Sequence, residues 1–180
     1  MIVLGVIGSP KAGGRTRVAV DAVLAGAALD GADTRVLELA ETGHDEVTAA
    51  MDAADAVVFG SPTYRADIAS GLKALLDATP RGASYETGDP LRGTVCATVL
   101  TGASDHHFLA VEKVRGILGG FFGAQLLSPG LYLPSAAFTD DGTALQDDPQ
   151  RLAGQHGRAL VELTAAVGSS TYLRALRPLI

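Results

Sequence analysis

Short apolar runs alternate with segments of helical periodicity from one end of the sequence to the other. The continuous apolar run over residues 2–7 is typical of a strand that helices cover on both faces of a parallel sheet. Residues 34–39 alternate between polar and apolar types, which predicts a half-exposed edge strand. The pattern predicts three further strands, at residues 56–59, at 94–100, and at 125–127 continued by 131–133 after a break.

Apolar residues at helical spacing separate these strands and predict five helices. The first begins at Arg15 and ends near Gly31, and the second covers residues 46–53. Two apolar stripes follow, one at Ile68, Leu72, Leu75 and Leu76 and one at Phe108, Val111, Val114, Leu118 and Phe122. The last helix is expected to have Asp148 as its N-cap, because Asp before Pro is a helix-start signal.

This alternation predicts an α/β protein with a three-layer, flavodoxin-like fold. We expect a five-stranded parallel sheet in the order 2-1-3-4-5, with helices on both faces. The length of 180 residues suits one domain spanning residues 1–180, and the packing of the tail, residues 169–180, is left open. Ligands of such folds bind outside the carboxyl ends of the strands. A ligand site is therefore expected in the loops after the first, third and fourth strands.

Composition narrows the class of protein. With 47% hydrophobic and 19% charged residues the chain is expected to pack a core, and a net charge of −6 argues against a nucleic-acid partner. A single cysteine, Cys96, cannot form an internal disulfide and reads as a small buried hydrophobe. No basic segment precedes the first strand, and prolines and glycines interrupt the uncharged residues 116–139. We expect a cytoplasmic protein with no membrane partner.

The loop after the first strand reads G-S-P-K-A-G-G-R-T and leads directly into a helix. The start of a helix leaves backbone N–H groups unpaired, and its dipole favours an anion. Gly14 lets the backbone approach a ligand closely, Ser9 and Thr16 offer hydroxyl groups, and Lys11 and Arg15 bring positive charge. This combination predicts a phosphate site.

Two common phosphate motifs do not fit this loop. A P-loop requires lysine where this chain has Gly14, and the dinucleotide fingerprint G-x-G-x-x-G is absent. The phosphate of a mononucleotide remains. A hydrolase is not supported either, because no G-x-S-x-G nucleophile motif occurs.

Two further turns follow the third and fourth strands. Their candidate ligand-binding residues are Pro62, Thr63, Tyr64 and Arg65 in one turn and Thr101, Gly102 and Ala103 in the other. Tyr64 is either an aromatic face for a flat ring or a partly exposed packing residue. Three such turns at adjacent strand ends predict a pocket for a flat molecule with a phosphate tail, and FMN has that shape.

These three segments resemble the NAD(P)H-dependent FMN reductases from residue 1 to about residue 133. The resemblance extends to the small reductases that supply reduced FMN to two-component monooxygenases, the alkanesulfonate system among them. It implies that Ser9, Lys11, Arg15 and Thr16 hold the FMN phosphate, that Pro62, Thr63, Tyr64 and Arg65 border the ribityl chain and ring, and that Thr101, Gly102 and Ala103 meet the pyrimidine edge. It also implies NAD(P)H as co-substrate, a homodimer or homotetramer, and a flavin-dependent monooxygenase as one candidate partner.

The chain departs from the family at a few positions. Lys11 replaces a common Arg, Gly14 a common Ser and Ala103 a common Gly. Reductases that release flavin to a monooxygenase can carry an inserted Tyr that forms a π-bulge in the fourth helix, and residues 110–115 contain no Tyr.

Two other functions therefore remain open. One is a quinone-, azo- or chromate-type reductase that keeps FMN tightly bound, and the other is a non-enzymatic flavodoxin-like electron carrier. Lys11, Arg15 and Arg65 would make the rim basic, which favours a phosphorylated nicotinamide over the acidic rim of a carrier. We predict no catalytic side chain, because the flavin itself carries the chemistry. Nor do we predict a metal site, because adjacent residues such as His106 and His107 point in different directions on a helix.

Overall fold

The computed structural model describes residues 1–83 and 86–178. Its strands are β1 (Ile2–Ile7), β2 (Asp33–Glu38), β3 (Ala56–Tyr64), β4 (Asp67–Ile68), β5 (Val95–Gly102), β6 (Gln125–Leu126) and β7 (Leu131–Pro134). Its α-helices are α1 (Arg15–Leu29), α2 (His44–Asp52), α3 (Ser70–Ala78), α4 (Ala110–Arg115), α5 (Asp147–Gly168) and α6 (Thr171–Ala175). Short 3₁₀ turns at Asp105–His107 and Ser135–Ala137 and a π-helical turn at Gly116–Phe121 complete the chain.

The main sheet is parallel and runs in the order β2-β1-β3-β5, followed by β6 and β7, which both pair with β5. This arrangement confirms the predicted 2-1-3-4-5 order and the flavodoxin-like fold class. The strand count differs from the prediction of five. The fifth position is divided between β6 and β7, and β4 adds a short antiparallel hairpin to β3.

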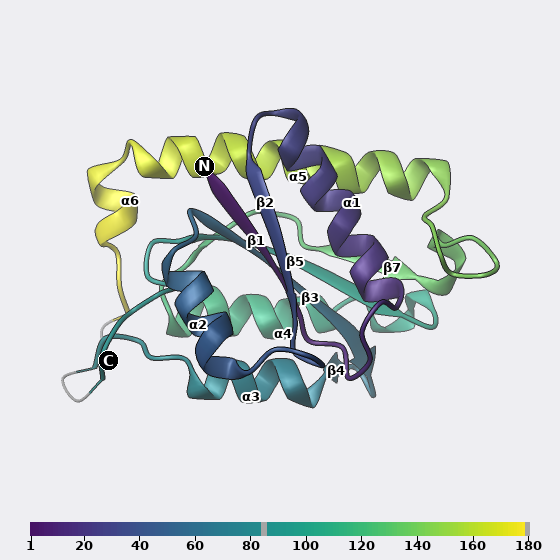
Figure 1. The fold of residues 1–180 in the computed structure, drawn as a ribbon, viewed down its shortest axis with the longest axis horizontal. Coiled ribbons are helices and arrows are strands. Elements are labelled where there is room, and N and C mark those ends of the chain that lie inside the picture. Colours follow the sequence, from purple (N-terminus) through teal and green to yellow (C-terminus); the bar gives the residue numbers. More distant parts are fainter. Residues whose placement is uncertain (84–85, 179–180) are drawn as a thin grey trace.

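Helices cover both faces of the sheet, as Figure 1 shows. On one face, α1 and α5 pack over side chains such as Val3, Ile7 and Val58. On the other face, α2, α3 and α4 pack over the alternate residues, among them Leu4 and Phe59. Cys96 lies in this second core and is fully buried, as predicted. The two apolar cores explain why the central strands read as continuous apolar runs.

Several boundaries differ from the sequence prediction. β3 continues past Phe59 to Tyr64, because residues 60–62 keep pairing with β5. The N-cap of α5 is Gln146 rather than Asp148, which lies in the first turn of the helix. The predicted fourth helix is divided into a 3₁₀ turn, α4 and the π-helical turn, in which Phe122 N–H donates to the carbonyl of Ile117 at 3.2 Å. The π-helical turn forms without the inserted Tyr considered above.

No helix in the described ranges combines the length and the apolar character that crossing a membrane requires.

The tail, whose packing the sequence left open, folds back onto its own chain. Gln125 donates a hydrogen bond from Nε2 to the carbonyl of Leu173 at 2.9 Å. Gly93 and Gly123 both adopt positive φ, and a Cβ atom at Gly93 would lie 2.7 Å from the carbonyl oxygen of Arg174. Glycine is needed there because the backbones meet directly. Leu179, at the end of this tail, lies outside the described residues.

Glycines also bring α1 and α5 into close contact on one face. A Cβ atom at Gly157 would lie 1.9 Å from the carbonyl oxygen of Val23, whereas a Cβ atom at Gly154, one turn earlier, would meet no atom within 4 Å. The two glycines of α5 therefore differ in role: Gly157 is required by packing, and Gly154 only weakens the helix.

This difference gives a matched pair of variants. Gly157→Ala should lower the free energy of unfolding by about 1–3 kcal/mol or more, because the methyl group separates the two helices. Gly154→Ala should leave the protein as stable or raise its stability by up to about 1 kcal/mol, because alanine is the better helix former. Urea unfolding followed by circular dichroism measures both, and equal effects would contradict the close packing.

Candidate functional site

The three predicted loops meet at the carboxyl ends of β1, β3 and β5. Gly8 N–H donates to the carbonyl of Gly60 at 2.8 Å, which joins the first loop to β3. Pro62 lies opposite Thr101 in the register of β3 and β5, and the hydroxyl oxygens of Thr16 and Thr101 are 2.9 Å apart. We call residues 8–16, 60–65 and 101–104 the carboxyl-end site.

The first turn of α1 has no side-chain cap within the described chain. Gly14 is the N-cap residue, with extended backbone angles, and Gly13 before it adopts a φ of +70°. A Cβ atom at either glycine would meet no atom within 4 Å, so space is available above the loop. The first N–H groups of α1 are therefore suited to an anion, and the dipole of the helix favours a negative charge there.

A buried carboxylate fixes this loop from below. Glu38 at the end of β2 is only 7% exposed, and its two oxygens accept hydrogen bonds from Gly13 N–H at 3.0 Å and from Arg17 at 2.9 Å. Arg17 also donates to Asp21 at 2.7 Å, and these hydrogen bonds to Asp21 and Glu38 raise the pKa of Arg17. Glu38 was not among the predicted site residues. Its position at the end of a half-exposed strand is the one feature of the sequence that could have indicated it.

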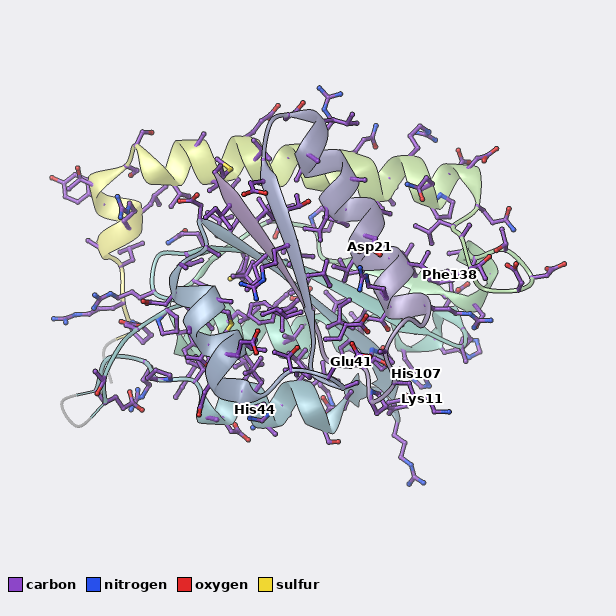
Figure 2. All side chains as sticks on the ribbon, in the orientation of Figure 1. Lys11, Asp21, Glu41, His44, His107 and Phe138 are labelled. Atoms are coloured by element: carbon purple, nitrogen blue, oxygen red, sulfur yellow. The ribbon has the colours of Figure 1, made fainter. Side chains whose placement is uncertain are left out.

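Ser9 and Lys11 form a compact turn. The hydroxyl of Ser9 donates to the carbonyl of Lys11 at 2.7 Å and accepts from Lys11 N–H at 3.3 Å. Ser9 therefore shapes the loop, and the side chain of Lys11 extends into solvent. Figure 2 shows Lys11 and His107 at the end of the molecule where α1 begins.

Arg15 is held by the segment after β7, which the sequence analysis did not connect with this site. Its Nη1 donates to the hydroxyl of Ser135 at 2.8 Å, and its guanidinium carbon lies 5.7 Å from the ring centroid of Phe138. The hydroxyl of Ser135 in turn donates to the carbonyl of Gly102 at 3.3 Å. Figure 2 shows Phe138 next to the beginning of α1. Arg15 thus joins the first loop to the end of β5.

The hairpin of β3 and β4 places Tyr64 and Arg65 at the border of the site. Arg65 and Ala66 have φ angles of 51° and 61°, a left-handed conformation that is strained for residues with side chains. Tyr64 is 53% exposed. Asp67 of β4 accepts a hydrogen bond from Lys113 of α4 at 2.8 Å, and this bond and that from Ile68 N–H lower the pKa of Asp67. The hairpin is therefore anchored to α4.

Packing against Tyr132 explains why the third loop has a glycine at position 102. A Cβ atom at Gly102 would lie 1.9 Å from the hydroxyl oxygen of Tyr132, which donates to the carbonyl of Ser104 at 2.8 Å. Burial raises the pKa of this phenol. Gly102 is thus required by Tyr132 whether or not a ligand is bound.

The predicted site residues divide into three groups by exposure: buried, half-buried and exposed. Thr16 and Thr101 are buried and bonded to each other, so they hold the loops together. The residues exposed to solvent are Lys11, Gly14, Arg15, Tyr64, Arg65 and Ala103, and Ser9, Pro62, Thr63 and Gly102 are half-buried.

Comparison with known proteins places residues 1–138 within the family model described as NADPH-dependent FMN reductase. An NADH-dependent FMN reductase of Pseudomonas putida is 34% identical over 89 residues, which are 49% of this chain and 44% of that protein. An iron-sulfur flavoprotein of Methanocaldococcus jannaschii is 31% identical over 125 residues, covering 58% of this chain and 63% of that protein. Each match covers less than two thirds of the relative's own length.

Among solved structures, the apo form of an NADH:FMN oxidoreductase superposes with a TM-score of 0.77. The superposition covers 97% of this chain and 94% of that chain, at 20% sequence identity. At this identity the likeness shows the shared fold. It supports the fold class predicted from the alternation of strands and helices.

The strained hairpin yields a prediction about stability. Ala66→Gly should raise the free energy of unfolding by about 0.5–1 kcal/mol, because glycine adopts a positive φ without the cost that alanine has. Ala53, at the exposed C-cap of α2, has a φ of −87° and serves as the control. Ala53→Gly should lower the free energy of unfolding by about 0.4–1 kcal/mol, because glycine raises the conformational entropy of the unfolded chain. Urea unfolding measures both changes in the free energy of unfolding. Changes of the same sign in the two variants would contradict backbone strain at Ala66.

Proposed function

Because this chain belongs to the NADPH-dependent FMN reductase family, we propose that it transfers hydride from a reduced nicotinamide to FMN held at the carboxyl-end site. FMN is the flavin of this family, and NAD(P)H is its co-substrate. The observation that carries the assignment is the uncapped start of α1, which lies beside two other loops at the edge of the sheet. A single anionic group with a flat ring attached matches this arrangement.

The fit of the flavin phosphate rests on the open space above Gly13 and Gly14. The first N–H groups of α1 would donate to the phosphate, and Arg15 and Lys11 would supply positive charge. Arg15 is already oriented by Ser135 and Phe138, so it loses little side-chain freedom when it binds. Glu38 does not oppose the phosphate strongly, because Arg17 neutralises its charge and Gly13 N–H donates a hydrogen bond to it.

The ring would lie between the hairpin and the third loop. Pro62, Thr63, Tyr64 and Arg65 would border it on one side, and the backbone of Thr101, Gly102 and Ala103 would meet its pyrimidine edge. Bound FMN supplies the hydride acceptor, and the protein orients the nicotinamide against it and excludes water. Gly60 and Ser61 of β3 are buried where β3 pairs with β5, next to the first loop. No acid or base side chain is assigned to the reaction.

The acceptor of the electrons distinguishes three forms of this proposal. In the first, reduced flavin leaves for a monooxygenase or another acceptor. The chain has a π-helical turn at Gly116–Phe121, but this turn lacks the inserted Tyr of reductases that release flavin. In the second, FMN stays bound while a quinone, azo compound or chromate is reduced. In the third, the protein is an electron carrier. The exposed cations Lys11, Arg15 and Arg65 favour the enzymatic forms, because they attract a phosphorylated nicotinamide.

An anaerobic titration of the full chain tests the proposal. FMN is added first and NADPH or NADH second, while the visible absorbance of the flavin is followed. Bleaching much faster than that of free FMN is the expected result. Binding without bleaching would indicate the electron carrier, and the absence of FMN binding would overturn the assignment of the site.

Removing one cation tests the phosphate contact separately. Arg15→Ala should weaken FMN binding by about 1.5–3 kcal/mol, the range for hydrogen bonds to charged groups. Arg158→Ala is the matched control, because Arg158 lies on α5 and pairs with Asp30 at 3.1 Å, at the other end of α1. Quenching of flavin fluorescence gives both dissociation constants. Equal affinities of the two variants would exclude Arg15 from the phosphate site.

A further inference from the structure

A pocket lies at the end of the sheet opposite the carboxyl-end site, beside the amino ends of β5 and β6. Its volume is about 290 Å³, and its walls come from the loop between α3 and β5, the end of the π-helical turn and the segment after α6. The side chains that characterise it are Arg81, Asp89, Arg92, Phe121, Phe122 and Arg177. β5, which runs from Val95 to Gly102, lies between this pocket and the carboxyl-end site. At about 3.3 Å per residue, the strand is about 23 Å long. Figure 1 shows α6 and the described end of the chain far from the start of α1.

Positive charge gathers in this pocket, although the chain as a whole has a net charge of −6. Three of its lining residues are arginines, Arg81, Arg92 and Arg177. The guanidinium carbon of Arg81 lies 4.7 Å from the ring centroid of Phe121, so stacking orients this group. Guanidinium groups bind phosphate oxygens in pairs of parallel hydrogen bonds. The arginines therefore suit an anionic group, phosphate above all.

Asp89 requires a different partner. Its side chain is 12% exposed and forms an ion pair with Arg92, whose Nε lies 3.2 Å from Oδ2, but neither carboxylate oxygen accepts a hydrogen bond within the described residues. Gly82, with a φ of +77°, leaves room for this carboxylate, since a Cβ atom there would lie 2.9 Å from Oδ2. The ion pair offsets part of the cost of burying this carboxylate, and the hydrogen bonds that its two oxygens lost from water are not replaced. A ligand that brings an O–H or N–H donor would relieve this cost.

The neighbouring carboxylate cannot take that role. Glu86 accepts hydrogen bonds from the N–H groups of Arg81 at 2.8 Å and Ala83 at 3.0 Å. These two bonds lower the pKa of Glu86 and fix the turn that carries Arg81. Phe122, which is buried, packs edge-on against Phe121 with ring centroids 5.1 Å apart and fixes the aromatic wall.

We propose that this pocket binds a nucleoside monophosphate. Arg92 and Arg177 hold the phosphate, Asp89 accepts a hydrogen bond from a hydroxyl or amino group, and the base lies against the pair formed by Arg81 and Phe121. A volume of about 290 Å³ lies at the lower end of the range of ligand pockets, about 300–1,000 Å³, and suits a mononucleotide rather than a dinucleotide. The site is separate from the proposed flavin site and does not rest on it.

Calorimetric titration of the full chain, with saturating FMN present, tests this site with adenosine 5′-monophosphate as the probe. One molecule should bind per chain, and more tightly than either adenosine or inorganic phosphate. Arg177→Ala should weaken this binding at least tenfold. The side chain of Arg177 is exposed, so the variant is expected to fold. Arg151→Ala is the matched control, because Arg151 is exposed on α5 and does not line the pocket, and it should leave the affinity unchanged.

Asp89→Asn gives a second readout that a purely structural role would not produce. It should leave the affinity for inorganic phosphate equal or higher, because a negative charge is removed, and should reduce the advantage of the nucleotide over phosphate. The proposal is overturned if the nucleotide competes with FMN, if it does not bind, or if Arg177→Ala changes nothing. If the chain binds no FMN, the proposed function fails while the comparison of Arg177→Ala with Arg151→Ala still tests this pocket.

Discussion

The carboxyl-end site depends on one buried carboxylate. Glu38 lies at the end of the edge strand and accepts hydrogen bonds from Gly13 and Arg17, so it ties β2 to the first loop and to the first turn of α1. Burying such a charge costs several kcal/mol unless donors and an opposite charge compensate it, and here both do. Because Glu38 takes the N–H of Gly13, the chain turns into α1 with Gly14 as its N-cap. The N–H groups that follow are left for a ligand.

The two ends of the sheet carry different chemistry on the same strands. At the carboxyl ends, Thr16, Thr101 and Ser135 connect loops that lie far apart in the sequence, so the exposed residues around them are held in place. At the amino ends, Gly93 and Gly123 let the backbone of the tail pack directly on the sheet. β5 runs from one end to the other. A packed parallel sheet thus separates the carboxyl-end site from the pocket at the amino ends of the strands.

The fold could be read from the sequence because the signals are local. The run over Ile2–Ile7 is apolar and bounded by turn residues, and the alternation of strands and helices leaves few topologies. The same order places the loops after β1, β3 and β5 at one edge, so the sequence could predict that Lys11, Arg15 and Tyr64 lie at that edge. Glu38 and Ser135 were missed because they are separated from Gly13 and Arg15 by 25 and 120 positions. No local sequence motif indicates such pairs. The left-handed turn at Arg65 and Ala66 could not be predicted either, because Arg and Ala rarely adopt a positive φ.

We propose that the start of α1 recognises the phosphate of FMN. Riboflavin has the ring and ribityl chain of FMN without the phosphate, so the ratio of the two dissociation constants, measured by flavin fluorescence, isolates that contact. We expect FMN to bind at least about 100-fold more tightly, equivalent to about 2.8 kcal/mol. Equal affinities would show that the phosphate does not bind at the start of α1, and the account of the site would be wrong.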